Sequence, residues 1–143
     1  MKFLNSVLQR DADFARLYSA VATQQLPLAA TGLSRIHKAI VSATLARLTE
    51  RRIVLITHDE TSANELRDDL VSLGMNALNL PSRDYNLTEL RGFSREYEQK
   101  RIDTLSAVAD GAFELLTVAV DSAVQYTVPP ERLIRNRFEL AVG

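Results

Sequence analysis

The chain has 143 residues, of which 46% are hydrophobic and 24% charged, and 17 Lys and Arg against 18 Asp and Glu give a net charge of −1. This composition predicts a soluble globular domain with a sizeable core, and it gives no overall attraction to nucleic acid or to a membrane surface. The absence of cysteine excludes disulfides, thiolate metal sites and cysteine nucleophiles, and two histidines exclude a histidine-rich metal site. Because no apolar run approaches the ~20 residues that span a bilayer, we expect a cytoplasmic protein.

The first half of the chain predicts helices followed by a strand and a turn. Apolar residues at helical spacing predict two short helices within residues 1–25, with Asp11 or Asp13 capping the second. The short apolar run 26–30 predicts a strand, and residues 33–50 predict a helix with a broad apolar face. This order is that of a phosphate loop, in which backbone N–H groups and a helix N-terminus hold an anion.

The phosphate-loop pattern G-x-x-x-x-G-K-[ST] fits this junction only partly. In one register Gly32 leads and Lys38 takes the lysine position, but His37 and Ala39 replace the second glycine and the hydroxyl residue. In the other register the four pattern positions hold Ala29, Ser34, Arg35 and Ile36. Neither register keeps a hydroxyl for magnesium, so a strand-to-helix turn that needs only Gly32 is favoured over a working ATP site. We therefore predict a degenerate phosphate loop without bound cofactor at Thr31, Gly32, Ser34, Arg35 and Lys38.

Residues 53–60 combine a strand with a polar end. The run Ile53 to Thr57 predicts a central parallel strand covered on both faces. The residues that follow are either an acidic magnesium-binding box or a helix start, in which Thr57 and Glu60 form a capping box and Asp59 suits the helix N-terminus. We favour the helix start, because a metal here has no phosphate-loop hydroxyl to share.

The middle of the chain predicts a helix, a strand, a loop and a second helix. Gly74 is placed to end a helix, residues 77–80 predict a short strand, and residues 81–93 predict a long surface loop. Ser94 is expected to cap the next helix, on whose outer side Glu96 can pair with Lys100. Its predicted inner side carries Tyr97, Arg101, Ile102, Leu105, Val108 and Ala109.

The last part predicts one more buried strand and two short helices. Residues 114–120 form the strand, Asp121 is the expected N-cap of a helix to Tyr126, and residues 131–135 fit another helical turn after Pro129 and Pro130. Residues 138–142 are predicted to start a further strand.

The alternation of strands and helices predicts an α/β fold with a parallel sheet and helices on both faces, similar to a P-loop NTPase (helicase-like) lobe with a degenerate phosphate loop. We expect an N-terminal helical segment at 1–25, an α/β domain at 26–136, and the start of a truncated following domain at 137–143.

Several stretches resemble a known family. These are residues 31–34 (TGLS), 53–57 (IVLIT), 80–84 (LPSRD), 94–105 (SREYEQKRIDTL), 115–120 (LLTVAV) and 128–133 (VPPERL). The chain is similar to the N-terminal region of bacterial transcription-repair coupling factor, most specifically within residues 81–105. The resemblance implies a domain like the first domain of the helicase-like excinuclease subunit, but with a decayed phosphate loop, in the register that places Arg35 and Ile36 at the lysine and hydroxyl positions.

The resemblance also implies a function. Members of this family are ATP-dependent DNA translocases that remove stalled RNA polymerase and recruit nucleotide excision repair. The ATP- and magnesium-dependent motor and the RNA-polymerase-binding domain lie outside this chain, and the damage-recognition subunit of excision repair is expected to bind mainly the domain beginning near Phe138. The chain is thus expected to be a non-catalytic scaffold, with no catalytic, metal-binding or partner-binding residues assigned to it.

Two alternatives belong to other classes. A stand-alone nucleotide-binding enzyme would use Lys38, Thr57 and Asp59 around phosphate. A nucleic-acid-binding module would use a basic strip of Arg83, Arg91, Arg95, Lys100 and Arg101. Because acidic residues lie among these five, a solvated face of mixed charge is favoured over the basic strip.

Overall fold

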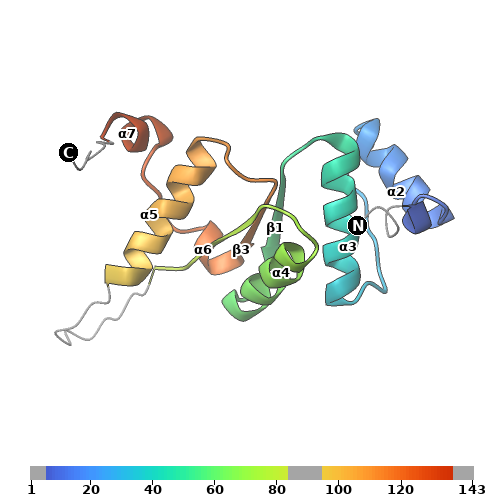
Figure 1. Ribbon diagram of the computed structural model, residues 1–143, viewed down its shortest axis with the longest axis horizontal. Helices are drawn as coiled ribbons and strands as arrows, with labels where there is room; N and C mark the ends of the chain where they lie inside the picture. The colour runs from blue at the N-terminus through green and yellow to red at the C-terminus, as the bar shows by residue number, and fades with distance from the viewer. Residues whose placement is uncertain (1–5, 84–94, 137–143) are drawn as a thin grey trace.

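A three-stranded parallel sheet forms the centre of the molecule. The computed structural model describes residues 6–83 and 95–136 (Figure 1). Strands β1 (Ile53–Thr57), β2 (Ala77–Leu80) and β3 (Leu115–Ala119) lie in the order β1-β3-β2. In this register Thr117 of β3 lies between Leu55 of β1 and Asn79 of β2. The predicted parallel α/β fold is confirmed.

Helices cover both faces of this sheet, as predicted. Figure 1 shows α5 on one side of the strands and α3 and α4 on the other. The helices are α2 (Ala12–Ala22), α3 (Arg35–Thr49), α4 (Glu60–Ser72), α5 (Arg95–Ala109), α6 (Val120–Ala123) and α7 (Pro130–Arg135). Within the described ranges, none of the helices is both long enough and apolar enough to span a membrane.

Local sequence signals explain where several helices begin and end. The Asp11 carboxylate accepts a hydrogen bond from the Phe14 N–H at 2.8 Å, so of the two predicted candidates, Asp11 and Asp13, it is Asp11 that caps α2. Helix α3 ends before Glu50, as expected, and Gly74, with φ +73°, follows the C-cap residue of α4. Pro130 opens α7 at a position where its missing N–H is not needed.

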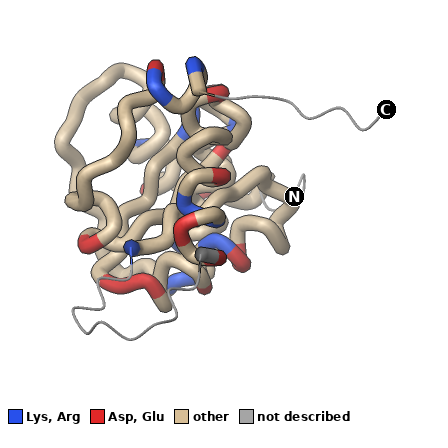
Figure 2. The backbone as a smooth tube through the Cα atoms, turned by 90° about the vertical axis from the view of Figure 1, so that its left-hand side faces the viewer, with Lys and Arg blue, Asp and Glu red and all other residues tan. Residues whose placement is uncertain are grey.

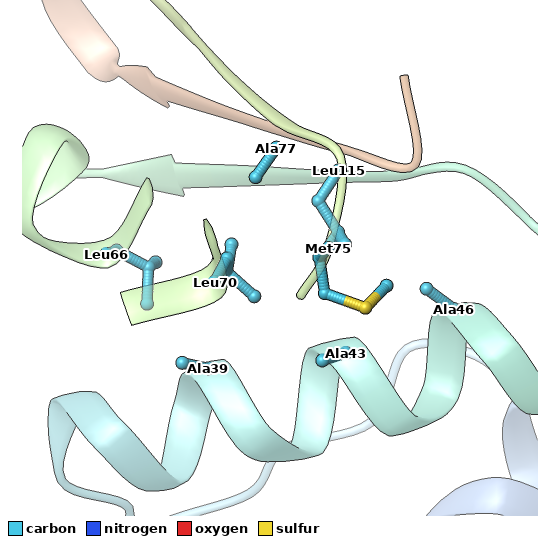
Figure 3. Packing of buried hydrophobic residues seen from close by; sticks show 8 residues of the cluster. All are labelled: Ala39, Ala43, Ala46, Leu66, Leu70, Met75, Ala77 and Leu115. Carbon is cyan, nitrogen blue, oxygen red and sulfur yellow. The ribbon is translucent and has the colours of Figure 1, made fainter. Parts of the chain in front are cut away.

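The larger core cluster lies between α3, α4 and the sheet. Figure 3 shows its buried residues, which are Ala39, Ala43, Ala46, Leu66, Leu70, Met75, Ala77 and Leu115. The residues that α3 contributes are all alanines, and these small side chains let α3 approach α4 closely. A second cluster on the opposite face joins Leu80, Leu116 and Val118 to Leu105 and Val108 of α5.

Strand β1 differs from its prediction as a central strand covered on both faces. It lies at the end of the strand order, and Val54 and Ile56 are 52% and 65% exposed. The reason is that α5 packs on β2 and β3, so the side chains of β1 that point to the same face stay uncovered by it. An apolar strand sequence therefore does not by itself place the strand in the centre of the sheet.

Two details of the later helices also differ from the prediction. Tyr97 and Ile102, expected on the inner side of α5, are 51% and 48% exposed. Ile102 is rotated about 100° from Arg101 around the helix axis, so it points away from the inner side. Tyr97 lies one helical turn before Arg101, and Arg101 already contacts the end of β2. Asp121 lies in the first turn of α6 and is not its N-cap, because the helix begins directly where β3 ends and Ala119 takes that place.

Some predictions fall outside the described ranges. They are the Ser94 cap, the strand at 138–142 and most of the loop at 81–93. The division of the chain at residues 25 and 136 stays a prediction.

Candidate functional site

The predicted strand at residues 26–30 is not formed. These residues have no regular secondary structure, the Leu26–Pro27 peptide bond is cis, and Leu26 and Leu28 are 60% and 49% exposed. Pro27 has no N–H to donate to a neighbouring strand. The prediction of a strand here is therefore wrong, and the strand–turn–helix order of a phosphate loop is absent at this place.

The turn itself keeps the conformation that the sequence predicts. Gly32 has a φ of +79°, and a Cβ added there would have no atom within 4 Å. The glycine is thus needed for its backbone conformation and not for space. Ser34 takes the N-cap position of α3 without a side-chain capping bond, and its Oγ lies 3.1 Å from Nδ1 of His37. Thr31 and Lys38 are exposed on either side of this turn.

Arg35 is directed toward α4. Its Nε donates to Asp69 Oδ2 at 2.7 Å, and its Nη1 donates to Glu65. The hydrogen bond to Asp69, and to a smaller extent the one to Glu65, raises the pKa of the guanidinium above its ordinary value. The residue that replaces the phosphate-loop lysine in the second register therefore links two helices, and its charge is balanced by two carboxylates.

The end of β1 is a helix start, as we favoured, but Asp59 caps the helix in place of Thr57. The Asp59 Oδ1 accepts a hydrogen bond from the Ser62 N–H at 2.6 Å, and the Thr57 hydroxyl donates to the Asp59 carbonyl at 2.8 Å. His58 Nε2 lies 2.9 Å from Asp59 Oδ2. Within residues 6–83 and 95–136, no three His, Asp or Glu side chains are grouped so that they could hold a metal ion.

Asp59 gives the fold a defined pH dependence. The Ser62 hydrogen bond, followed by the charge of His58, lowers the Asp59 pKa below its ordinary value of 3.8. A pKa that is lower in the folded than in the unfolded state stabilises the fold at pH values above the unfolded-state pKa. This stabilisation is lost as the pH falls through the folded-state pKa.

We expect Asp59→Asn, which still caps the helix but does not titrate, to melt at a lower temperature than wild type at pH 7. The difference should shrink toward pH 2 in thermal melts, and a constant difference would contradict this assignment.

Among the residues that the structure describes, the basic strip of the nucleic-acid-binding alternative does not form one surface, because Arg101 is buried while Lys100 is exposed. Figure 2 shows basic and acidic positions interspersed on the side of the molecule that it presents. Lys100 pairs with Glu96 at 2.9 Å, as predicted, and this hydrogen bond raises the Lys100 pKa. Arg101 is only 2% exposed and is therefore withdrawn from the surface. Arg91 and the side chain of Arg95 lie outside the described residues.

Arg101 lies on the inner side of α5, as predicted, and not on the surface as the basic-strip alternative requires. Its Nη1 donates to the Pro81 carbonyl and to Ser122 Oγ, the latter at 2.7 Å, and its Nη2 lies 3.4 Å from the Ser122 carbonyl. Ser122 is fully buried, and its hydroxyl is within 3.0 Å of the Leu80 and Pro81 carbonyls. Arg101 thus joins α5, the end of β2 and α6. The sequence signal was its place on the predicted inner side of α5.

A cavity of about 820 Å³ lies beside the turn, between α2, α3 and residues 28–33. Its walls are mainly apolar, from Phe14 and Leu17 of α2 to Ile40 and Val41 of α3, and His37 in the first turn of α3 also lines it. The sequence prediction missed this cavity because it placed residues 26–30 in the sheet.

The fold is that of a small α/β protein, with a three-stranded parallel sheet covered by helices on both faces. Over 132 residues the chain is 24% identical to the transcription-repair-coupling factor of Bacillus subtilis strain 168. The similarity covers 91% of this chain but only 11% of that protein, so the chain spans about a tenth of the relative's length. No family model and no solved structure matches the chain.

Proposed function

We propose that the chain is a non-catalytic scaffold segment of a transcription-repair coupling factor, an ATP-dependent DNA translocase that displaces stalled RNA polymerase and recruits excision repair. The observation that carries this proposal is the similarity to the Bacillus subtilis protein along 91% of the chain. In this proposal the chain presents surfaces of the larger protein, and the chemistry belongs to other domains.

The geometry around Gly32 and Arg35 supports the part of this proposal that gives the chain no nucleotide site. Arg35 is held by Glu65 and Asp69 of α4, and no strand leads into the turn at Gly32. The cofactors ATP and magnesium, and the partners RNA polymerase and DNA, are then bound by the motor and other domains of the full-length protein. The damage-recognition subunit of excision repair binds mainly the domain beginning near Phe138.

A titration with ATP and magnesium separates this proposal from a stand-alone nucleotide-binding enzyme. Isothermal titration calorimetry should give no binding heat up to millimolar ATP. In the enzyme alternative, Lys38 contacts phosphate from its exposed position beside the turn. Micromolar binding that Lys38→Ala abolishes would therefore overturn the scaffold proposal in favour of the enzyme.

A chimera tests the identity of the larger protein. This chain would replace the similar segment of the Bacillus subtilis protein, and repair of a transcribed DNA strand would be measured in cells lacking the native protein. We expect repair well above that of the deletion strain. Repair at the level of the deletion strain, from a chimera that is expressed and melts cooperatively, would contradict the proposal.

A further inference from the structure

Helix α2 is joined to the rest of the fold by a narrow contact with α3. Figure 1 shows α3 between α2 and the strands, and the two described core clusters draw their residues from α3, α4, α5, the sheet and the adjoining turns. Phe14 and Ala20 are the buried residues of α2, and the cavity of about 820 Å³ lies in the space between α2 and α3. Few apolar contacts therefore hold α2 in place.

The hydrogen bonds of α2 are local. Asp11 accepts a hydrogen bond from the Phe14 N–H, and the Gln25 N–H donates to the Ala20 carbonyl, so these bonds stay within the helix and its two ends. Helix α3 is joined to α4 in another way, through Arg35 with two carboxylates of α4 and through the larger core cluster. The contact between α3 and α4 thus has polar and apolar parts, whereas that between α2 and α3 rests on apolar packing beside a cavity.

Residues 23–33, here called the connector, link α2 to α3. Residues 23–32 are exposed, and residues 25–33 contain no helix or strand. Gln24 and Gly32, near the two ends of the connector, have φ of 58° and 79°, and the chain turns or bends at both. Because the connector buries little of its own surface, it does not tie α2 to the sheet or to α4.

We propose that α2 and the connector form a lid that opens from α3 as one unit while α3, α4 and the sheet stay folded. Segments held by few buried apolar contacts open at a lower free energy than the core does. Opening exposes the apolar walls of the cavity, which α2 lines with Leu17 and α3 with Ile40 and Val41. An isolated helix of 11 residues is marginal in water, so α2 loses its helical hydrogen bonds when the lid is open.

Amide hydrogen exchange of the whole chain, resolved by residue, tests this opening. The amides from Arg16 to Ala22 should exchange through one common opening, with protection at least about a hundredfold lower than that of the amides in α4 and β3. Protection that rises gradually along α2 would show fraying of the helix end in place of a lid. Either that gradient or equal protection of α2 and α4 would overturn the proposal.

Two variants separate the lid from the core. Phe14→Ala removes the largest buried side chain of α2 and should abolish the protection of α2, while α4 and β3 stay protected. The matched control Leu70→Ala should lower the protection of α4 and β3 and leave that of α2 unchanged. Leu70→Met is a milder change at the same position and replaces this control if Leu70→Ala does not fold. A Phe14→Ala chain that loses protection in all elements, or fails to fold, would overturn the proposal.

Discussion

Replacing Arg101 by methionine should lower the free energy of unfolding by about 3 kcal/mol, because it removes a charged donor from buried oxygen atoms. Methionine fills a similar volume but leaves the Pro81 carbonyl without the Nη1 donor, and Ser122 loses its contacts to both guanidinium nitrogens. The loss should appear in urea unfolding followed by circular dichroism as a lower midpoint with an unchanged slope.

Two further variants separate the shape of the arginine from its charge. Arg101→Lys keeps the charge but has no planar fork, so it should be nearly as unstable as Arg101→Met. Lys100→Met removes the neighbouring cation, whose side chain is 64% exposed, and should leave the midpoint close to that of wild type. Equal effects of Arg101→Met and Lys100→Met would show that the buried contacts of Arg101 contribute little.

The sequence predicted the described strands and most helices because periodicity is a local property. The run IVLIT locates β1, and the spacing of Leu66 and Leu70 locates the buried side of α4. The order of the strands depends on pairing between distant segments, and nothing within residues 53–57 encodes it. The central place predicted for β1 followed from its composition alone, which is why it was wrong.

The candidate site was predictable only where one residue decides its conformation. Gly32 was expected to have a special backbone angle, and its φ of +79° agrees. The partners of Arg35 lie 30 and 34 positions further along the chain, so its role in joining α3 to α4 could not be seen before the helices were packed. Asp59 and Thr57 lie only two positions apart, and the choice between them as the cap depends on where the strand ends.

Leu70 is one of two completely buried leucines in the larger core cluster, and its truncation should destabilise the fold strongly. It is completely buried on α4, in the cluster that also contains Ala39 and Ala43 of α3 and Leu115 of the sheet (Figure 3). Leu70→Ala removes buried methyl groups and leaves a cavity that the surrounding side chains fill only partly. We therefore expect the free energy of unfolding to fall by about 3–4 kcal/mol, as measured by urea unfolding.

Neighbouring substitutions show whether this effect comes from packing. Leu70→Met conserves most of the volume and should cost less than about 1.5 kcal/mol. Val71→Ala changes the next residue of α4, which is 49% exposed, and should stay within about 0.5 kcal/mol of wild type. If Leu70→Ala were as mild as Val71→Ala, α3 and α4 would not be held together through this cluster. The Arg35 contacts to Glu65 and Asp69 would then be the main link between the two helices, because they join the same pair.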